Sequence, residues 1–248
     1  MRNLKAVAFA AAASAMLVGA AQAQVQGEFK WSGVNGAWST YANATQTKSW
    51  SVYTGPYQAQ FQIPGAPSPL LPPAGSSSFG PVTDIFCVDF NNEAITSTYT
   101  AWFTNLGANP LTDTRLGASG LSQYLKAAFL AQQIKTYGNN SVETADINGA
   151  IWQIMSGEPT YRLVGSTWQS AGITSWVNLA NANWQSVDAS QWVVVTKTCA
   201  AGAGNATADG CSQEFITQVT PEPATLLLLG TGLLVTLVAA GALRRPNA

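Results

Sequence analysis

The stretch GLSQYLKAAFLAQQIKTYG, residues 120–138, decides the fold class because the periodicity of the chain changes here. Its apolar residues recur at helical spacing, which indicates a helix with one buried face. They are Leu121, Tyr124, Leu125, Ala128, Phe129 and Ile134. Gly138 is suited to end the helix, because glycine adopts the left-handed conformation at a helix terminus without a steric penalty.

Two further helices are predicted after this one. Ser141 can cap the first of them, and Glu143 in its first turn favours the positive end of the helix dipole. Its apolar stripe consists of Ile147, Ala150, Ile151, Ile154 and Met155, and Gly157 ends it. The next helix is indicated by Ile173, Trp176, Val177, Ala180 and Trp184.

Strand patterns lie on both sides of the helices. Residues 48–53 and 57–63 alternate with period two around Gly55-Pro56, which predicts an early hairpin. Strand character returns at residues 82–90 and 95–103, and again after the helices at residues 191–198 and 213–219. This order predicts an α+β domain, in which a β-rich sandwich or barrel-like sheet packs against a group of about three helices.

The N-terminus has the three parts of a secretory signal peptide. Residues 1–5 are basic, residues 6–20 are apolar, and Ala21-Gln22-Ala23 is a small-x-small cleavage site. We therefore expect signal peptidase to remove residues 1–23 by cutting between Ala23 and Gln24. The exported domain then spans residues 24–219, with a Pro/Gly/Ser-rich loop at residues 64–80.

The C-terminal segment, residues 220–248, combines a short motif, an apolar run and a basic end. Pro221-Glu222-Pro223 precedes residues 224–243, which as a helix of about 30 Å would match the hydrocarbon core of a bilayer. Arg244 and Arg245 supply the positive flank that stays cytoplasmic, so the domain is expected across the inner membrane. An ordinary C-terminal anchor would share the helix and the arginines, whereas Pro-Glu-Pro favours a sorting signal.

Residues Val219 to Arg245 resemble the PEP-CTERM sorting domain of exported Gram-negative bacterial proteins. The resemblance implies that an exosortase recognises Pro221, Glu222 and Pro223 and processes the tail, with transient or permanent anchoring in the inner membrane. These residues are then acted upon by another enzyme and are not catalytic. Such proteins often occur in organisms that make exopolysaccharide or biofilm matrix, so the resemblance implies a cell-surface or extracellular protein.

The chain has three cysteines, and the exported domain is expected in an oxidising compartment, where cysteines form disulfides. Cys199 ends one predicted strand and Cys211 begins the next, with a Gly/Ala-rich loop between them. A disulfide between the two would close this hairpin and stabilise it by about 3 kcal/mol. Cys87 is then left over.

Two short strings around Cys87 and Asn148 form a second resemblance. Phe86-Cys87-Val88 and Asn148-Gly149-Ala150-Ile151-Trp152 are similar to strings in the thioester domains of bacterial surface adhesins. In those domains a cysteine bonds to a glutamine side chain and the bond captures an amine covalently. Asn148, one methylene shorter, stands at the glutamine position, so Cys87 and Asn148 are candidate thioester residues. The alternative is that Cys87 is a buried thiol that packs as a small hydrophobe.

Composition excludes several classes of function. Only 9% of the residues are charged and none is histidine, so the chain lacks the basic footprint of nucleic-acid binding and the imidazoles of common catalytic triads and zinc sites. We expect a non-enzymatic structural or adhesive protein without metal or cofactor. Its nine tryptophans have two possible roles. They can be buried in the hydrophobic core, or, if exposed, they can stack on sugars and make the protein a carbohydrate-binding module that contacts exopolysaccharide.

Overall fold

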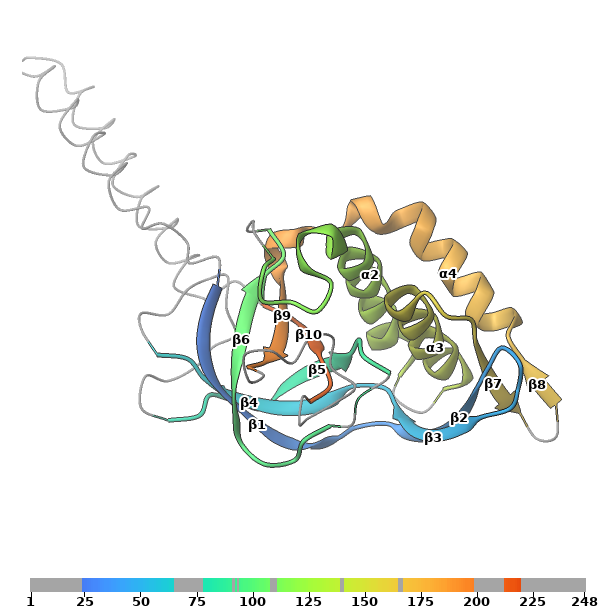
Figure 1. The fold of residues 1–248 in the computed structure, drawn as a ribbon, viewed down its shortest axis with the longest axis horizontal. Coiled ribbons are helices and arrows are strands. Elements are labelled where there is room, and N and C mark those ends of the chain that lie inside the picture. Colours follow the sequence, from blue (N-terminus) through green and yellow to red (C-terminus); the bar gives the residue numbers. More distant parts are fainter. Residues whose placement is uncertain are drawn as a thin grey trace, which may run out of the picture.

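The computed structural model describes residues 24–64, 78–90, 92, 94–107, 111–138, 141–164, 167–198 and 212–219, and it is an α+β fold as predicted (Figure 1). Within these residues, strands close into a barrel in the order β1-β4-β5-β10-β9-β6. The barrel strands are β1 (Gln24–Val34), β4 (Tyr57–Gln62), β5 (Thr83–Cys87), β6 (Tyr99–Asn105), β9 (Trp192–Lys197) and β10 (Phe215–Gln218). The barrel-like form of the predicted sheet is therefore confirmed.

A second sheet has the strand order β3-β2-β7-β8. Its strands are β2 (Ala37–Asn43), β3 (Ser49–Thr54), β7 (Thr160–Val164) and β8 (Thr167–Gln169). Figure 1 shows this sheet beside the barrel, with the helices at Val142–Ser156 and Ala171–Asn183 over one of its faces. The sequence patterns did not indicate β1, β2, β7 or β8.

The three predicted helices are confirmed as α2 (Leu121–Tyr137), α3 (Val142–Ser156) and α4 (Ala171–Asn183). Short 3₁₀ helices accompany them at Gly117–Gly120 (η1), Trp184–Ser186 (η2) and Ala189–Gln191 (η3). Ser141 caps α3, since its Oγ accepts a hydrogen bond of 3.0 Å from the Thr144 N–H. Gly138 and Gly157 end α2 and α3 with φ of 79° and 74°, which glycine adopts freely.

One long antiparallel ribbon joins the two sheets, and it corrects the predicted early hairpin. β1 pairs with β4 and β2 pairs with β3, so β3 and β4 lie in different sheets and do not form a hairpin with each other. The chain reverses instead between Asn43 and Lys48. Gly55-Pro56 is a bend between the two halves of the ribbon, where Asn35 N–H donates to the Pro56 carbonyl at 2.9 Å.

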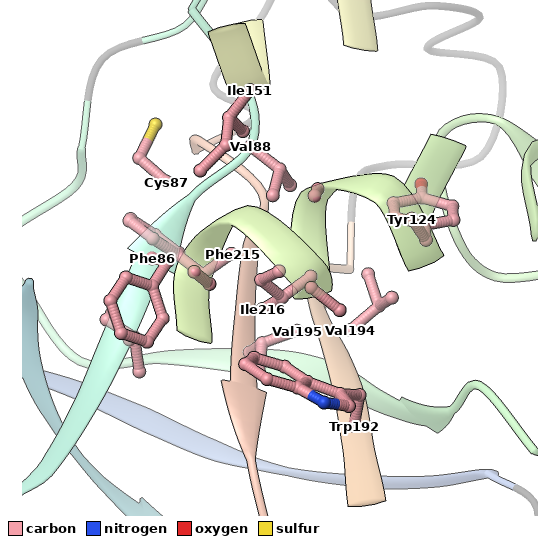
Figure 2. Packing of buried hydrophobic residues seen from close by; sticks show 14 of the residues in the cluster. Phe86, Cys87, Val88, Tyr124, Ile151, Trp192, Val194, Val195, Phe215 and Ile216 are labelled. Atoms are coloured by element: carbon pink, nitrogen blue, oxygen red, sulfur yellow. The ribbon is translucent and has the colours of Figure 1, made fainter. Parts of the chain in front are cut away.

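The core lies inside the barrel and between the barrel and α2. Phe215 pairs with Val195, and its ring stacks on Phe29 with 5.6 Å between the centroids. Alternation along the strands then places Val194 and Ile216 on the outside of the barrel, where Figure 2 shows them beneath a helix. Residues 192–195 of β9 are all buried because both faces of that strand are covered.

Two predicted segments fall largely or wholly outside the described residues. Of the loop at residues 64–80, only residue 64 and residues 78–80 are described. The predicted transmembrane helix at residues 224–243 lies outside them altogether. Among the described residues, no helix combines the length and the apolar character needed to cross a membrane.

Candidate functional site

Cys87 is the last residue of β5 and is fully buried. Its thiol donates a hydrogen bond to the carbonyl oxygen of Asp89, with 3.2 Å between Sγ and O. Burial raises the pKa of the Cys87 thiol to about 12, and the nearby Asp89 carboxylate contributes to the rise. The thiol is therefore protonated at neutral pH. Figure 2 shows Cys87 with its neighbours Phe86 and Val88 near Ile151 of α3.

The second string of the thioester resemblance lies on α3, next to β5. Trp152 Nε1–H donates to the backbone carbonyl of Cys87 at 3.2 Å. Asn148 lies one helical turn earlier and is fully buried, and its Nδ2 donates to the Thr144 carbonyl at 2.8 Å. Its Oδ1 has no hydrogen-bond partner. The fold thus brings the two strings together through Trp152, and a bond between Cys87 and Asn148 stays a prediction.

Glu214, which the sequence reasoning missed, is a carboxylate with only 1% of its surface exposed. Its Oε1 accepts hydrogen bonds from the Arg115 N–H at 2.9 Å and the Thr196 hydroxyl at 2.7 Å. Its Oε2 accepts one from the Tyr124 hydroxyl at 2.7 Å. Burial raises the pKa of Glu214 above its usual value, while these donors and the Arg115 charge act in the opposite direction. Glu214 directly precedes β10, so its hydrogen bonds join β10 to β9, to α2 and to the segment before α2.

An ion pair between Arg115 and Asp89 lies beside Glu214. Asp89 also accepts a hydrogen bond of 2.6 Å from Asn92 Nδ2. Asp89, Arg115 and Glu214 line a cavity of about 220 Å³. Its other walls are Val88, Phe90, Leu116, Met155 and Ser156. The charged groups on its wall are thus engaged with other protein groups, as buried polar groups usually are.

Metal binding finds no support in the described part of the chain. These residues contain no cluster of three or more cysteine or acidic side chains placed to hold a metal ion. The expectation that the protein uses neither metal nor cofactor stays a prediction.

Most of the other predicted site residues fall outside the part of the chain that the structure describes. Ala23, Cys199, Cys211, Pro221–Pro223, Arg244 and Arg245 are outside the described residues. Gln24, expected to follow the signal-peptidase cut, is the first residue of β1, and its Nε2 donates to Thr104 Oγ1 at 3.2 Å. At the other end, the Val219 N–H donates to the Gln191 carbonyl at 2.8 Å.

The tryptophans divide clearly by burial. Trp152 and Trp192 are core residues, whereas Trp38 and Trp50 are 61% and 39% exposed. The remaining five are half-buried: Trp31, Trp102, Trp168, Trp176 and Trp184. Both exposed tryptophans belong to the hairpin of β2 and β3, so exposed indole is concentrated on the second sheet.

The residues after β10 determine the class of protein. A family model described as the PEP-CTERM protein-sorting motif matches residues 219–245, which confirms the predicted motif. The chain therefore carries the sorting motif of an exported protein that is an exosortase substrate. The motif implies export and membrane-anchored transit to the cell surface. Comparison with curated proteins and with solved structures finds no match for this chain.

Proposed function

We propose that this protein is a non-enzymatic structural or adhesive component of the cell surface or extracellular matrix, associated with exopolysaccharide or biofilm. The observation that carries the proposal is the PEP-CTERM motif at residues 219–245, which begins where the last barrel strand ends. The motif supplies the route to the surface. The folded domain before it is the part that acts there.

The chemistry around the cavity supports a stabilising rather than a catalytic domain. Cys87 is buried and protonated at neutral pH, so it is a poor nucleophile. Glu214 accepts three hydrogen bonds from protein donors, and Asp89 is paired with Arg115. A general acid or base must be able to exchange its proton with a substrate, and these groups are committed to their protein partners.

Replacing Pro221, Glu222 and Pro223 by alanine tests the sorting step. We expect the variant to cross the inner membrane and lose its signal peptide, but to keep its C-terminal tail and remain in the membrane fraction. Fractionation of cells that express the full-length gene, with intact-mass measurement of each fraction, reads out both cut sites.

The chain offers a matched control in Glu158-Pro159, a second Glu-Pro pair that lies exposed in the turn after α3. Replacing both residues by alanine should leave processing and release unchanged. Normal release of tail-processed protein by the Pro221–Pro223 variant would contradict exosortase recognition. Uncleaved, folded protein in the cytosol would contradict export itself.

A covalent adhesin is the second candidate function. It is favoured by the Trp152–Cys87 hydrogen bond and by the buried Asn148 Oδ1, which has no partner. In the reaction, Cys87 Sγ would attack the side-chain carbonyl carbon of Asn148. A C–S bond would replace the C–N bond, and the amide nitrogen would leave as ammonia with the thiol proton.

Intact mass decides between a free and a bonded Cys87. A thioester lowers the mass of the exported protein by one ammonia molecule relative to the sequence, and the loss should be absent in Cys87→Ala. An exported protein with the full expected mass contradicts the covalent candidate and leaves the non-covalent proposal standing.

A further inference from the structure

The second sheet has one face covered by helices and one face turned away from them. Tyr41 of β2 points to the helices, since its hydroxyl donates to the Ala145 carbonyl of α3 and its ring packs on Trp152. Side chains alternate along a strand, so Trp38, Thr40 and Ala42 lie on the opposite face. We name this opposite face of β3, β2, β7 and β8 the outer face. In Figure 1 the helices lie on the other side of β2 and β3.

The outer face carries four aromatic side chains, two of which are in direct contact. Trp38 pairs with Tyr53 of β3 across the sheet, and their ring centroids lie 4.0 Å apart at an interplanar angle of 34°. Tyr161 of β7 pairs with Ala42, and Trp168 of β8 pairs with Leu163, so these rings belong to the same face. Trp38 is 61% exposed, and Tyr53, Tyr161 and Trp168 are half-buried. Each strand of the sheet except β2 thus adds one ring to the face that carries the exposed indole, and the ring of Tyr53 is the one that contacts it.

The same face is hydroxylated and uncharged. Thr40 and Ser51 lie opposite each other, with 3.1 Å between their exposed hydroxyl oxygens. The outer-face positions of the four strands are Trp38, Thr40, Ala42, Ser49, Ser51, Tyr53, Tyr161, Leu163 and Trp168, and none carries a charge. Ala42 is fully buried, and the other eight are at least partly exposed. The nearest charged residue of the sheet, Arg162, pairs with Tyr41 on the helix side and forms an ion pair with Asp146 there.

We propose that the outer face is a binding platform for an uncharged polysaccharide. Sugar rings present C–H groups that pack against aromatic rings and hydroxyls that form hydrogen bonds at their edges. The outer face supplies both kinds of partner, in the combination of aromatic area and a few polar groups that small-molecule sites use. An acidic polymer would need a cationic surface, which this face lacks. The inference rests on the proposed function and deepens it, because it names the matrix partner and its site.

Affinity electrophoresis of the exported protein, expressed from the full-length gene, tests the platform. The probes are hydroxyethyl cellulose, dextran and galactomannan as neutral polymers, and alginate as an acidic one. We expect at least one neutral polymer to retard the wild type, Trp38→Ala to weaken that retardation about tenfold or more, and Trp38→Phe to keep most of it. Trp50→Ala is the matched control, because Trp50 is an exposed tryptophan of the same hairpin on the helix side. The Trp50→Ala variant should bind the same neutral polymer with the affinity of the wild type.

A second variant guards against loss of folding. Ser51→Lys places a charge at an exposed outer-face position and should weaken binding while the thermal unfolding midpoint stays that of the wild type. The platform is overturned if no neutral polymer retards the wild type, if only alginate does, or if Trp38→Ala and Trp50→Ala bind alike. It is also overturned if sedimentation velocity shows a wild-type dimer that Trp38→Ala returns to a monomer, since a second copy would then cover the face. Surface location of a protein that binds no polymer would overturn the platform and leave the proposed function standing.

Discussion

Cys87 differs from a surface thiol in both access and protonation. It is fully buried, and its pKa is raised to about 12, whereas alkylating reagents attack accessible thiolates. We therefore expect iodoacetamide at about pH 8 to leave Cys87 unmodified in the native protein and to label it after unfolding in guanidinium. Peptide mass spectrometry measures the modified fraction, with Cys87→Ala as the control. Labelling of the native protein as fast as that of the unfolded protein would contradict the buried thiol.

Glu214 should make stability depend on pH. A carboxyl group with a raised pKa in the folded state contributes stability that is complete below its unfolded pKa, about 4.3. That contribution is lost as the pH rises through the folded pKa. Because glutamine does not titrate, the difference in unfolding free energy between wild type and Glu214→Gln should be largest near pH 4 and shrink at higher pH.

Urea unfolding of both proteins at several pH values measures this difference. Glutamine also cannot satisfy all three donors of Glu214, so the variant should be less stable by about 1–3 kcal/mol at the low end of the range. A difference that is constant with pH, or that grows as the pH rises, would contradict a raised pKa.

At the scale of elements, the long ribbon shows how a local signal can be read in two ways. Gly55-Pro56 has the residues of a turn, but here it is a bend opposite Asn35 and Gly36. A Cβ on Gly36 would lie 1.8 Å from the Thr54 carbonyl oxygen, so only glycine allows the two chains to approach this closely. A Gly-Pro pair can reverse the chain or only bend it, and the outcome here depends on the strands that pair with β3 and β4. These are β2 and β1, which precede them in the sequence.

The hairpin of β9 and β10 bears on the predicted disulfide. Val195 pairs with Phe215; in the sequence, Cys199 follows Val195 by four residues and Cys211 precedes Phe215 by four. The two cysteines lie outside the described residues, and their bond stays a prediction.

Alkylation of the unfolded protein tests the disulfide. Without reductant, we expect the reagent to modify one cysteine, Cys87; after reduction, we expect it to modify all three. Cys199→Ser should lower the unfolding free energy by about 3 kcal/mol. Three alkylated cysteines without reductant would contradict the disulfide.

At the scale of the whole molecule, α3 connects the barrel to the second sheet. Trp152 donates to Cys87 of β5, while Ala145 accepts from Tyr41 of β2. Gly149 lies between these two contacts and lets α3 approach α4 closely. A Cβ at this position would lie 2.6 Å from Ile173 Cδ1 and 3.1 Å from Tyr41 Cε1.

Gly149→Ala should therefore destabilise the whole domain by about 1–3 kcal/mol through overpacking. Adding Ile173→Val removes the methyl group that clashes and should restore part of the loss. Chemical denaturation of the single and double variants measures both effects. Equal stability of Gly149→Ala and wild type, or no recovery in the double variant, would contradict close packing of α3 at Gly149.

Much of the fold could be predicted because its signals are local. Apolar spacing, the Ser141 cap and the two helix-ending glycines are read within a few residues, and the helices they predict are all present. β7 and β8 were missed because they are only five and three residues long, and because β7 joins the sheet through a distant strand: Arg162 pairs with Tyr41. Glu214 was missed because nothing in its neighbours shows that Tyr124 and Arg115 surround it.

The sequence by itself determined the helices, most of the barrel strands and the C-terminal sorting motif, since each is encoded in a continuous stretch that needs no distant partner. Only the tertiary structure decided which strands pair, that the barrel closes, that Glu214 is buried, and that Trp38 lies exposed on the outer face while Trp152 is in the core. The physical reason is that pairing and burial depend on contacts between residues far apart along the chain, which periodicity does not record.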